Sequence, residues 1–132
     1  MHISLTYSPV INELFRLTNE VRAEHGLNPL VRSFPLDQAA QWMANDMFEN
    51  NYISHQDSWG NWVTQRHAVR LPGRQGWYAV GENLASGQAT PERAIQSWMD
   101  SEGHQLNMLR GNWVSVGLGH CARRWVQVFG SV

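Results

Sequence analysis

The order of the apolar patterns along the chain limits the fold more than any other feature of the sequence. Two segments, Ser8-Pro9 and Thr90-Pro91, place a capping hydroxyl before a proline, which is typical of the first residues of a helix. After these residues, and again from Pro35, apolar side chains recur at helical spacing. The pattern predicts three helices, from about Pro9 to His25, from Pro35 to Asn50 or Asn51, and from Pro91 through Trp98.

The last part of the chain changes to a period of two. Apolar residues alternate with smaller or polar ones from Val114 to Leu118 and from Trp125 to Phe129, which predicts a β-hairpin. Before it, Ser101 is expected to cap a short helical turn that carries His104. Helices followed by paired strands, without regular βαβ alternation, predict an α+β domain in which helices cover an antiparallel sheet.

The composition is that of one globular domain spanning residues 1–132, and 42% of its residues are hydrophobic. The formal net charge is −1, with 10 basic and 11 acidic residues, so no overall field favours nucleic acid as a partner. A local basic cluster has two interpretations, a contact for an anionic headgroup or glycan and, more simply, a solvated loop. This cluster consists of Arg66, His67, Arg70 and Arg74.

Cysteine content and hydropathy set further limits. Cys121 is the only cysteine, which excludes an intramolecular disulfide, and we expect a buried or bystander thiol there rather than a nucleophile. No apolar stretch approaches the roughly 20 residues of a membrane-spanning helix, and residues 1–9 lack the layout of a signal peptide. We therefore expect no transmembrane segment and no signal peptide in this sequence. A monomer is expected, because the hairpin is closed and no coiled-coil pattern is present.

Three side chains can carry chemistry. Glu82 and His104 each follow a glycine, which we expect to mark a corner of the chain, and His55 lies outside any apolar run. Two imidazoles and a carboxylate can share a proton or hold a divalent metal such as zinc, with His55 and His104 as ligands and Glu82 in support. The sequence contains neither the HExxH helix motif nor a G-x-S-x-G elbow, so the usual signatures of zinc and serine hydrolases are absent.

The seven tryptophans divide into two groups. Trp98 lies on the apolar face of the third helix and Trp125 in a strand, so both are expected in the core. Trp59, Trp62 and Trp77 belong to a segment from Ser54 to Val80 that has no long periodic pattern and is predicted as a loop. These three are the better candidates for lining a groove.

Together, these motifs resemble the CAP superfamily, also called SCP domains, which comprises cysteine-rich secretory, antigen 5 and pathogenesis-related-1 proteins. Small bacterial members are the most similar, and the resemblance covers nearly the whole chain. The opening helix and turn of the family are matched by Leu17–Arg22 with Gly26–Leu30, and its second helix and first site histidine by Ala39-Ala40 through Ser54-His55. The GEN motif is Gly81-Glu82-Asn83-Leu84, and Trp98–Leu109 resembles the bacterial motif W-x-x-S-P-G-H-R-x-N-I-L. The closing hairpin is matched by Val116–Gly119 with Gln127–Gly130.

The resemblance implies a three-layer α-β-α sandwich with a cleft around His55, Glu82 and His104. Three positions depart from the pattern: Glu102 replaces proline, Gln105 replaces arginine, and Ser101 stands where eukaryotic members carry a second site glutamate. Glu102 is kept as a candidate that reaches the cleft by a different path. The expected cleft residues are His55, Glu82, Ser101, Glu102, His104, Trp59, Trp62 and Trp77.

For function, the resemblance implies a non-enzymatic module, secreted or in the cell envelope, that binds a lipid, glycan or protein in this cleft. Zinc or another divalent metal is the only cofactor that it suggests. Two alternatives stay open. One is a hydrolase of peptides or esters that uses Glu82, His55 and His104 for proton transfer. The other is a structural cluster, in which Glu82 hydrogen-bonds the imidazoles and another surface carries the interaction.

Overall fold

The computed structural model of the chain describes residues 8–66, 77 and 79–131. Its centre is a four-stranded sheet in the order β1-β3-β4-β2. The strands are β1 (Val31–Arg32), β2 (Ala79–Ser86), β3 (Ser115–Cys121) and β4 (Arg124–Ser131). The helices are α2 (Pro9–Glu24), α3 (Phe34–Glu49), α4 (Pro91–Met99) and α5 (Glu102–Met108), with a 3₁₀ turn, η1, at Val63–Gln65.

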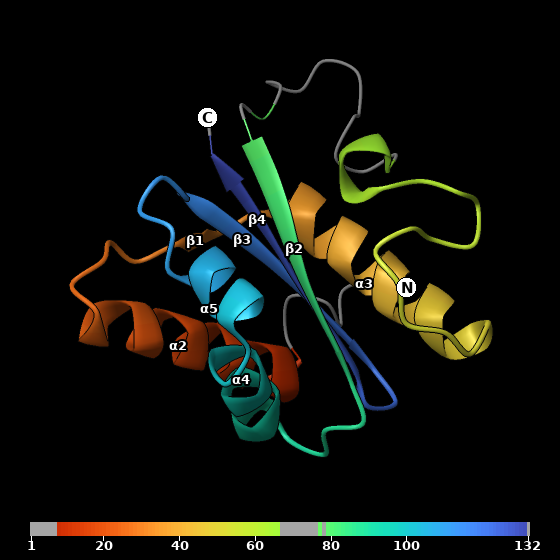
Figure 1. Cartoon of the computed structure of the whole chain (residues 1–132), viewed down its shortest axis with the longest axis horizontal. Helices are drawn as coiled ribbons and strands as arrows, with labels where there is room; N and C mark the ends of the chain where they lie inside the picture. Colours follow the sequence, from red (N-terminus) through yellow and green to blue (C-terminus); the bar gives the residue numbers. More distant parts are fainter. Residues whose placement is uncertain (1–7, 67–76, 78, 132) are drawn as a thin grey trace.

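The sheet separates two layers of helices (Figure 1). Helix α3 covers one face, where its apolar side chains meet Leu84, Val126 and Val128. Helices α2, α4 and α5 cover the other face, and Trp98 and Trp125 are buried in the core there, as predicted. This arrangement confirms the expected α+β sandwich. No helix in the described part of the chain is long and apolar enough to span a membrane.

The predicted helix starts are confirmed, and their capping contacts explain why. The Ser8 hydroxyl accepts a hydrogen bond from the amide of Ile11, and the Thr90 hydroxyl accepts one from the amide of Arg93. Each serine or threonine thus satisfies one of the free amides at a helix start. The observed ends differ from the predicted ones by one or two residues.

Strand β2 differs from the sequence prediction, in which its first residues belong to a loop and Gly81 marks a corner. The eight residues pair antiparallel with β4 over their whole length. Glu82 and Asn83 are buried polar residues in the middle of this strand, and they hide the apolar alternation that would predict it. The short strand β1, also not predicted, pairs parallel to β3 and makes the sheet mixed.

Helix α3 lies unusually close to β3, because glycines face it at two alternate positions. A Cβ atom at Gly117 would lie 2.0 Å from the carbonyl carbon of Leu36, and one at Gly119 would lie 2.4 Å from that of Ala40. Both contacts involve helix backbone, which cannot rotate away as a side chain can. Glycine at these positions therefore sets the distance between the sheet and α3.

We predict that Gly117→Ala lowers the free energy of unfolding by about 3 kcal/mol, because α3 must move away from the sheet to admit the methyl group. Urea denaturation followed by far-ultraviolet circular dichroism measures the change. Gly111→Ala is the matched control, since the nearest atom to its new Cβ is a Leu27 methyl at 3.9 Å. Equal midpoints for the two variants would contradict the close seating of α3.

Candidate functional site

Strand β2 lies at the edge of the sheet, and α5 covers that edge through amide side chains. Asn83 donates hydrogen bonds to the His104 carbonyl oxygen at 3.1 Å and to the Gln127 side-chain oxygen at 3.0 Å. Asn107 donates to the Glu82 carbonyl oxygen at 3.2 Å and to the Asn83 side-chain oxygen at 3.2 Å. These contacts hold α5, and with it His104, at one register beside Glu82.

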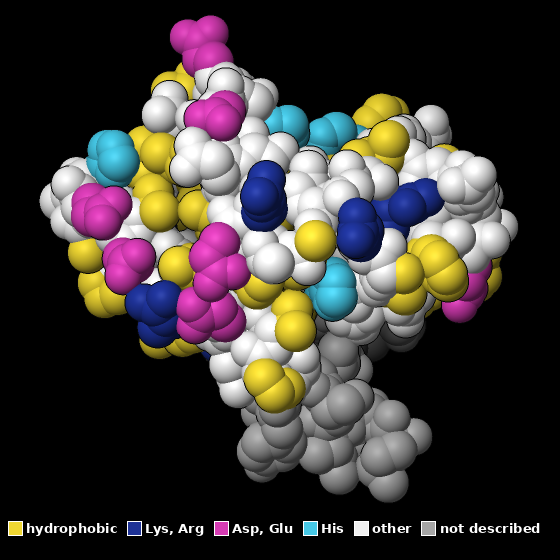
Figure 2. Space-filling view, turned by 90° about the horizontal axis from the view of Figure 1, so that it is seen from below, with side chains coloured by type: hydrophobic (Ala, Val, Ile, Leu, Met, Phe, Trp, Pro, Cys, Tyr) yellow, Lys and Arg dark blue, Asp and Glu magenta, His cyan; other side chains and the backbone are white. Residues whose placement is uncertain are grey.

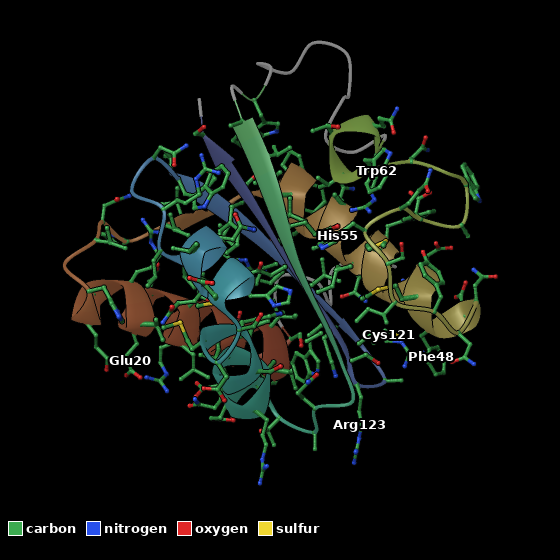
Figure 3. All side chains as sticks on the ribbon, viewed as in Figure 1. Glu20, Phe48, His55, Trp62, Cys121 and Arg123 are labelled. Carbon is green, nitrogen blue, oxygen red and sulfur yellow. The ribbon has the colours of Figure 1, made fainter. Side chains whose placement is uncertain are left out.

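The Glu82 carboxylate is buried and uses both oxygens. Arg66 donates from Nη1 to Oε2, and His55 Nδ1 lies 3.0 Å from Oε1. Because an ionised carboxylate only accepts, His55 carries its hydrogen on Nδ1 in this contact. Figure 3 shows His55 beside β2, on the segment that follows α3.

Arg66 corrects the interpretation of the basic cluster as a solvated loop. Its side chain is 3% exposed, pairs with Asp57 at 3.4 Å as well as with Glu82, and donates to the His55 carbonyl oxygen at 2.9 Å. A buried guanidinium between two buried carboxylates ties the segment from His55 to Arg66 onto the sheet. The other members of the cluster, His67, Arg70 and Arg74, lie outside the described residues.

His104 is positioned by a different partner. Its Nδ1 lies 3.0 Å from the Ser101 hydroxyl oxygen, one helical turn earlier. Ser101 stands at the N-cap of α5, as predicted, but its side chain makes no capping hydrogen bond. Burial, and then the charge of His55, lower the pKa of the His104 imidazole. The two imidazoles are therefore electrostatically coupled.

A pocket of about 370 Å³ joins these groups. It is lined by His55, Glu82, Asn83, Ser101, Gly103, His104, Leu106, Asn107 and Arg110. Four of the expected cleft residues are among them: His55, Glu82, Ser101 and His104. Asn107 and Arg110 were not expected. Asn107 follows His104 by three residues on α5, which is the signal that places both on one side of the helix, whereas Arg110 lies just beyond the end of α5 and carries no such signal.

The remaining expected cleft residues do not line this pocket. Trp59 is 77% exposed and meets Trp42 of α3 edge to face, with ring centroids 5.8 Å apart. Trp62 is also exposed (Figure 3), and Trp77 packs against the core cluster on the α3 side of the sheet. Glu102 is exposed at the start of α5.

The donor set fits a metal only in part. Among the described residues, no group of three or more His, Cys, Asp and Glu side chains is arranged to hold a metal ion. Glu82 is engaged through both oxygens, so its place fits that of a carboxylate that orients a ligating histidine. His55 and His104 would supply two Nε2 donors, and water or a bound ligand would complete the coordination.

Cys121 and His120 lie on β3, outside the pocket. The thiol is half-buried, and burial raises its pKa, which disfavours the nucleophilic thiolate. The His120 ring stacks on Trp125, with centroids 4.1 Å apart, and burial lowers the pKa of its imidazole. These contacts fit the expected bystander role of the thiol.

The fold and these motifs define the class of protein. The chain belongs to the CAP family, the cysteine-rich secretory protein family, whose model matches residues 15–129. The uncharacterized protein YkwD of Bacillus subtilis (strain 168) is 33% identical over 120 residues, which cover 89% of this chain and 45% of YkwD. This chain therefore spans less than half the length of that relative.

Two solved structures are similar to the whole fold. An extracellular protein containing an SCP domain from Bacillus anthracis shares 30% identity with a TM-score of 0.85, over 92% of this chain and 40% of the other. An outer surface protein from Borrelia burgdorferi shares 23% identity with a TM-score of 0.82, over 94% of this chain and 93% of the other. At 23% identity the likeness is one of fold alone.

We predict that Arg66→Met lowers the free energy of unfolding by about 3–5 kcal/mol, because it leaves Glu82 and Asp57 buried without a cation. Arg16→Met is the control. Arg16 pairs with Glu13 and Glu20 on the exposed face of α2, where solvent screens the charges, so its loss should change the free energy of unfolding far less than Arg66→Met does. Urea denaturation measures both variants.

Adding Glu82→Gln to Arg66→Met should recover part of the lost stability, since it removes one of the unpaired charges. A similar loss for Arg66→Met and Arg16→Met would contradict the buried network.

We predict that His120 makes the protein less stable as the pH falls from about 7.5 to about 5.5. Its pKa is lowered in the folded state, so the unfolded chain binds the proton more readily and gains from it below about pH 6.5. His120→Phe keeps an aromatic ring beside Trp125 and should make the dependence of the urea midpoint on pH shallower, while His104, whose pKa is also lowered, keeps its own contribution. His25→Phe, at an exposed position, should leave that dependence as in the wild type, and a wild-type slope in His120→Phe would contradict the assignment.

Proposed function

We propose that this CAP domain is a non-catalytic module that binds a ligand in the pocket between His55 and α5, where His55 and His104 hold a divalent ion such as zinc. One observation carries the proposal: each imidazole has its Nδ1 engaged by a partner from the protein, Glu82 for His55 and Ser101 for His104. In the described part of the chain, both Nε2 atoms are left for a ligand. Fixed outer partners of this kind are typical of histidines that bind metal.

The same contacts count against a hydrolase. A general base must be reachable by the water or substrate, whereas the Glu82 side chain is 2% exposed and its two oxygens bind Arg66 and His55. Ser101 touches His104, but no carboxylate among the described residues orients the far side of that ring, as the usual activated serine requires. The pocket is therefore better suited to binding than to turnover.

A purely structural role for the cluster explains the exposure of His55 less well than a binding site does. Glu82 and Arg66 are buried and serve stability, but the His55 side chain is 49% exposed and lines an open pocket. A histidine needed only for packing gains little from such exposure. We propose that the buried pair holds the segment in place and that the two histidines meet the ligand.

The names of similar proteins support a location outside the cytoplasm. One neighbour is described as an extracellular protein and another as an outer surface protein. We propose that this domain is secreted or held in the cell envelope, where lipids, glycans and other proteins are the available ligands. The proposal concerns the domain, since this chain covers only 45% of YkwD.

Calorimetric titration of zinc into chelator-treated protein tests the metal site. We predict stoichiometric binding to the wild type and its loss in both His55→Ala and His104→Ala. Ser101→Ala should weaken binding by about 10-fold or more, because it removes the partner that orients His104. His25→Ala is the control, at an exposed histidine that follows α2 and does not line the pocket, and should bind zinc as the wild type does.

Two outcomes would contradict the metal assignment. No heat of binding in the wild type would leave a metal-free pocket, in which case lipids and glycans are screened directly. Equal loss in His25→Ala would show that zinc binds to scattered surface histidines instead.

A further inference from the structure

The pocket lacks a free anionic group, although a glutamate lies in it. Glu82 is the only carboxylate among its described lining residues, and Arg66 and His55 occupy both of its oxygens. The two imidazoles carry no negative charge in either of their protonation states. The groups left to face a ligand are therefore neutral or positive.

Arg110 adds a permanent positive charge to the pocket wall. Within the described part of the chain it forms no ion pair, unlike Arg16, Arg32 and Arg66, which all pair with carboxylates. Figure 2 shows one face of the molecule, on which some basic side chains lie beside acidic ones and others stand apart from them. The charge of Arg110 is left for a molecule from outside.

Arg110 is also held in place. Its guanidinium carbon lies 5.1 Å from the centre of the Trp113 ring, which is itself buried and donates to the Asn107 carbonyl oxygen at 2.7 Å. Its own carbonyl oxygen accepts a hydrogen bond from the buried Arg22 at 2.9 Å. Backbone and head group are thus both positioned, which reduces the entropy lost when the guanidinium binds a ligand.

From these observations we infer that the pocket takes the anionic oxygen group of its ligand, a carboxylate or a phosphate, between Arg110 and the two imidazoles. This inference rests on the proposed function, in which the ligand occupies this pocket, and adds the chemical class of the group that is recognised. The planar guanidinium presents paired donors that match a carboxylate or phosphate, and Arg110 selects for that group.

The test is a titration of metal-free protein with inorganic phosphate and with acetate, followed by amide chemical shifts. We expect shifts at residues 103–110 in the wild type and an affinity at least about 10-fold lower in Arg110→Gln. Arg110→Lys should retain part of the affinity, because it keeps the charge without the fork. Arg93→Gln is the matched control, since it removes one charge from exposed α4, outside the pocket.

A second arm identifies the source of the anion. Flotation with phosphatidylglycerol vesicles, against phosphatidylcholine vesicles, asks whether the anion is a lipid headgroup. Binding to the anionic vesicles alone that Arg110→Gln abolishes supports the inference with a lipid source. Phosphate or acetate binding without vesicle binding supports it with a soluble source.

The inference is overturned if none of these probes binds the wild type, or if Arg110→Gln binds them as tightly as the wild type does. A zinc titration of Arg110→Gln separates this failure from a failure of the proposed function. Zinc binding that depends on His55 and His104, with no dependence of anion binding on Arg110, removes only the inference. Loss of zinc binding and of every pocket-dependent shift in the wild type removes both.

Discussion

Glu82 carries a carboxylate into the interior of the protein, where an unpaired charge is far more costly than on the surface. Arg66 supplies the opposite charge from 16 residues earlier in the chain, and Asp57 shares the same guanidinium. The segment from His55 to Arg66 has little regular secondary structure, so this network replaces the backbone ladder that would otherwise fix it. Arg66 pairs with Glu82 on β2 and also donates to the His55 carbonyl oxygen, so the same side chain that neutralises Glu82 holds His55 beside the pocket.

The same network decides what the site can do. A buried carboxylate that binds Arg66 and His55 can orient a histidine, but a substrate has little access to it. On the other side of the pocket, Ser101 takes the corresponding place beside His104, at a position where the resemblance to eukaryotic members leads one to expect a glutamate. The site therefore combines one charged and one neutral partner for two histidines, which lowers the negative charge near them.

The features that could be predicted from the sequence have local causes. Ser8 and Thr90 cap the helices that follow them, and alternation in the hairpin reports the two faces of the sheet. Strand β2 could not be predicted in this way, because its buried polar residues are satisfied by Arg66 and Gln127, which are remote in sequence. The directions of Trp59 and Trp62 could not be predicted either, because a loop has no regular period that relates its side chains to one face.

The residues that line the pocket differ in burial: Asn83, at its floor, is part of the core, whereas Leu106 and Arg110, at its rim, are exposed. Asn83 on the floor bonds to Gln127, which in turn donates to Thr18 of α2 at 3.0 Å, and all three are buried. Changing any of them leaves a buried polar group without a partner, so the floor is constrained by stability. Leu106 and Arg110 on the rim are exposed and carry no such constraint. Under the proposed function, a change at the rim can therefore alter ligand preference while the two histidines and the sheet stay in place, and Arg110 is the rim residue that we propose selects the anionic group.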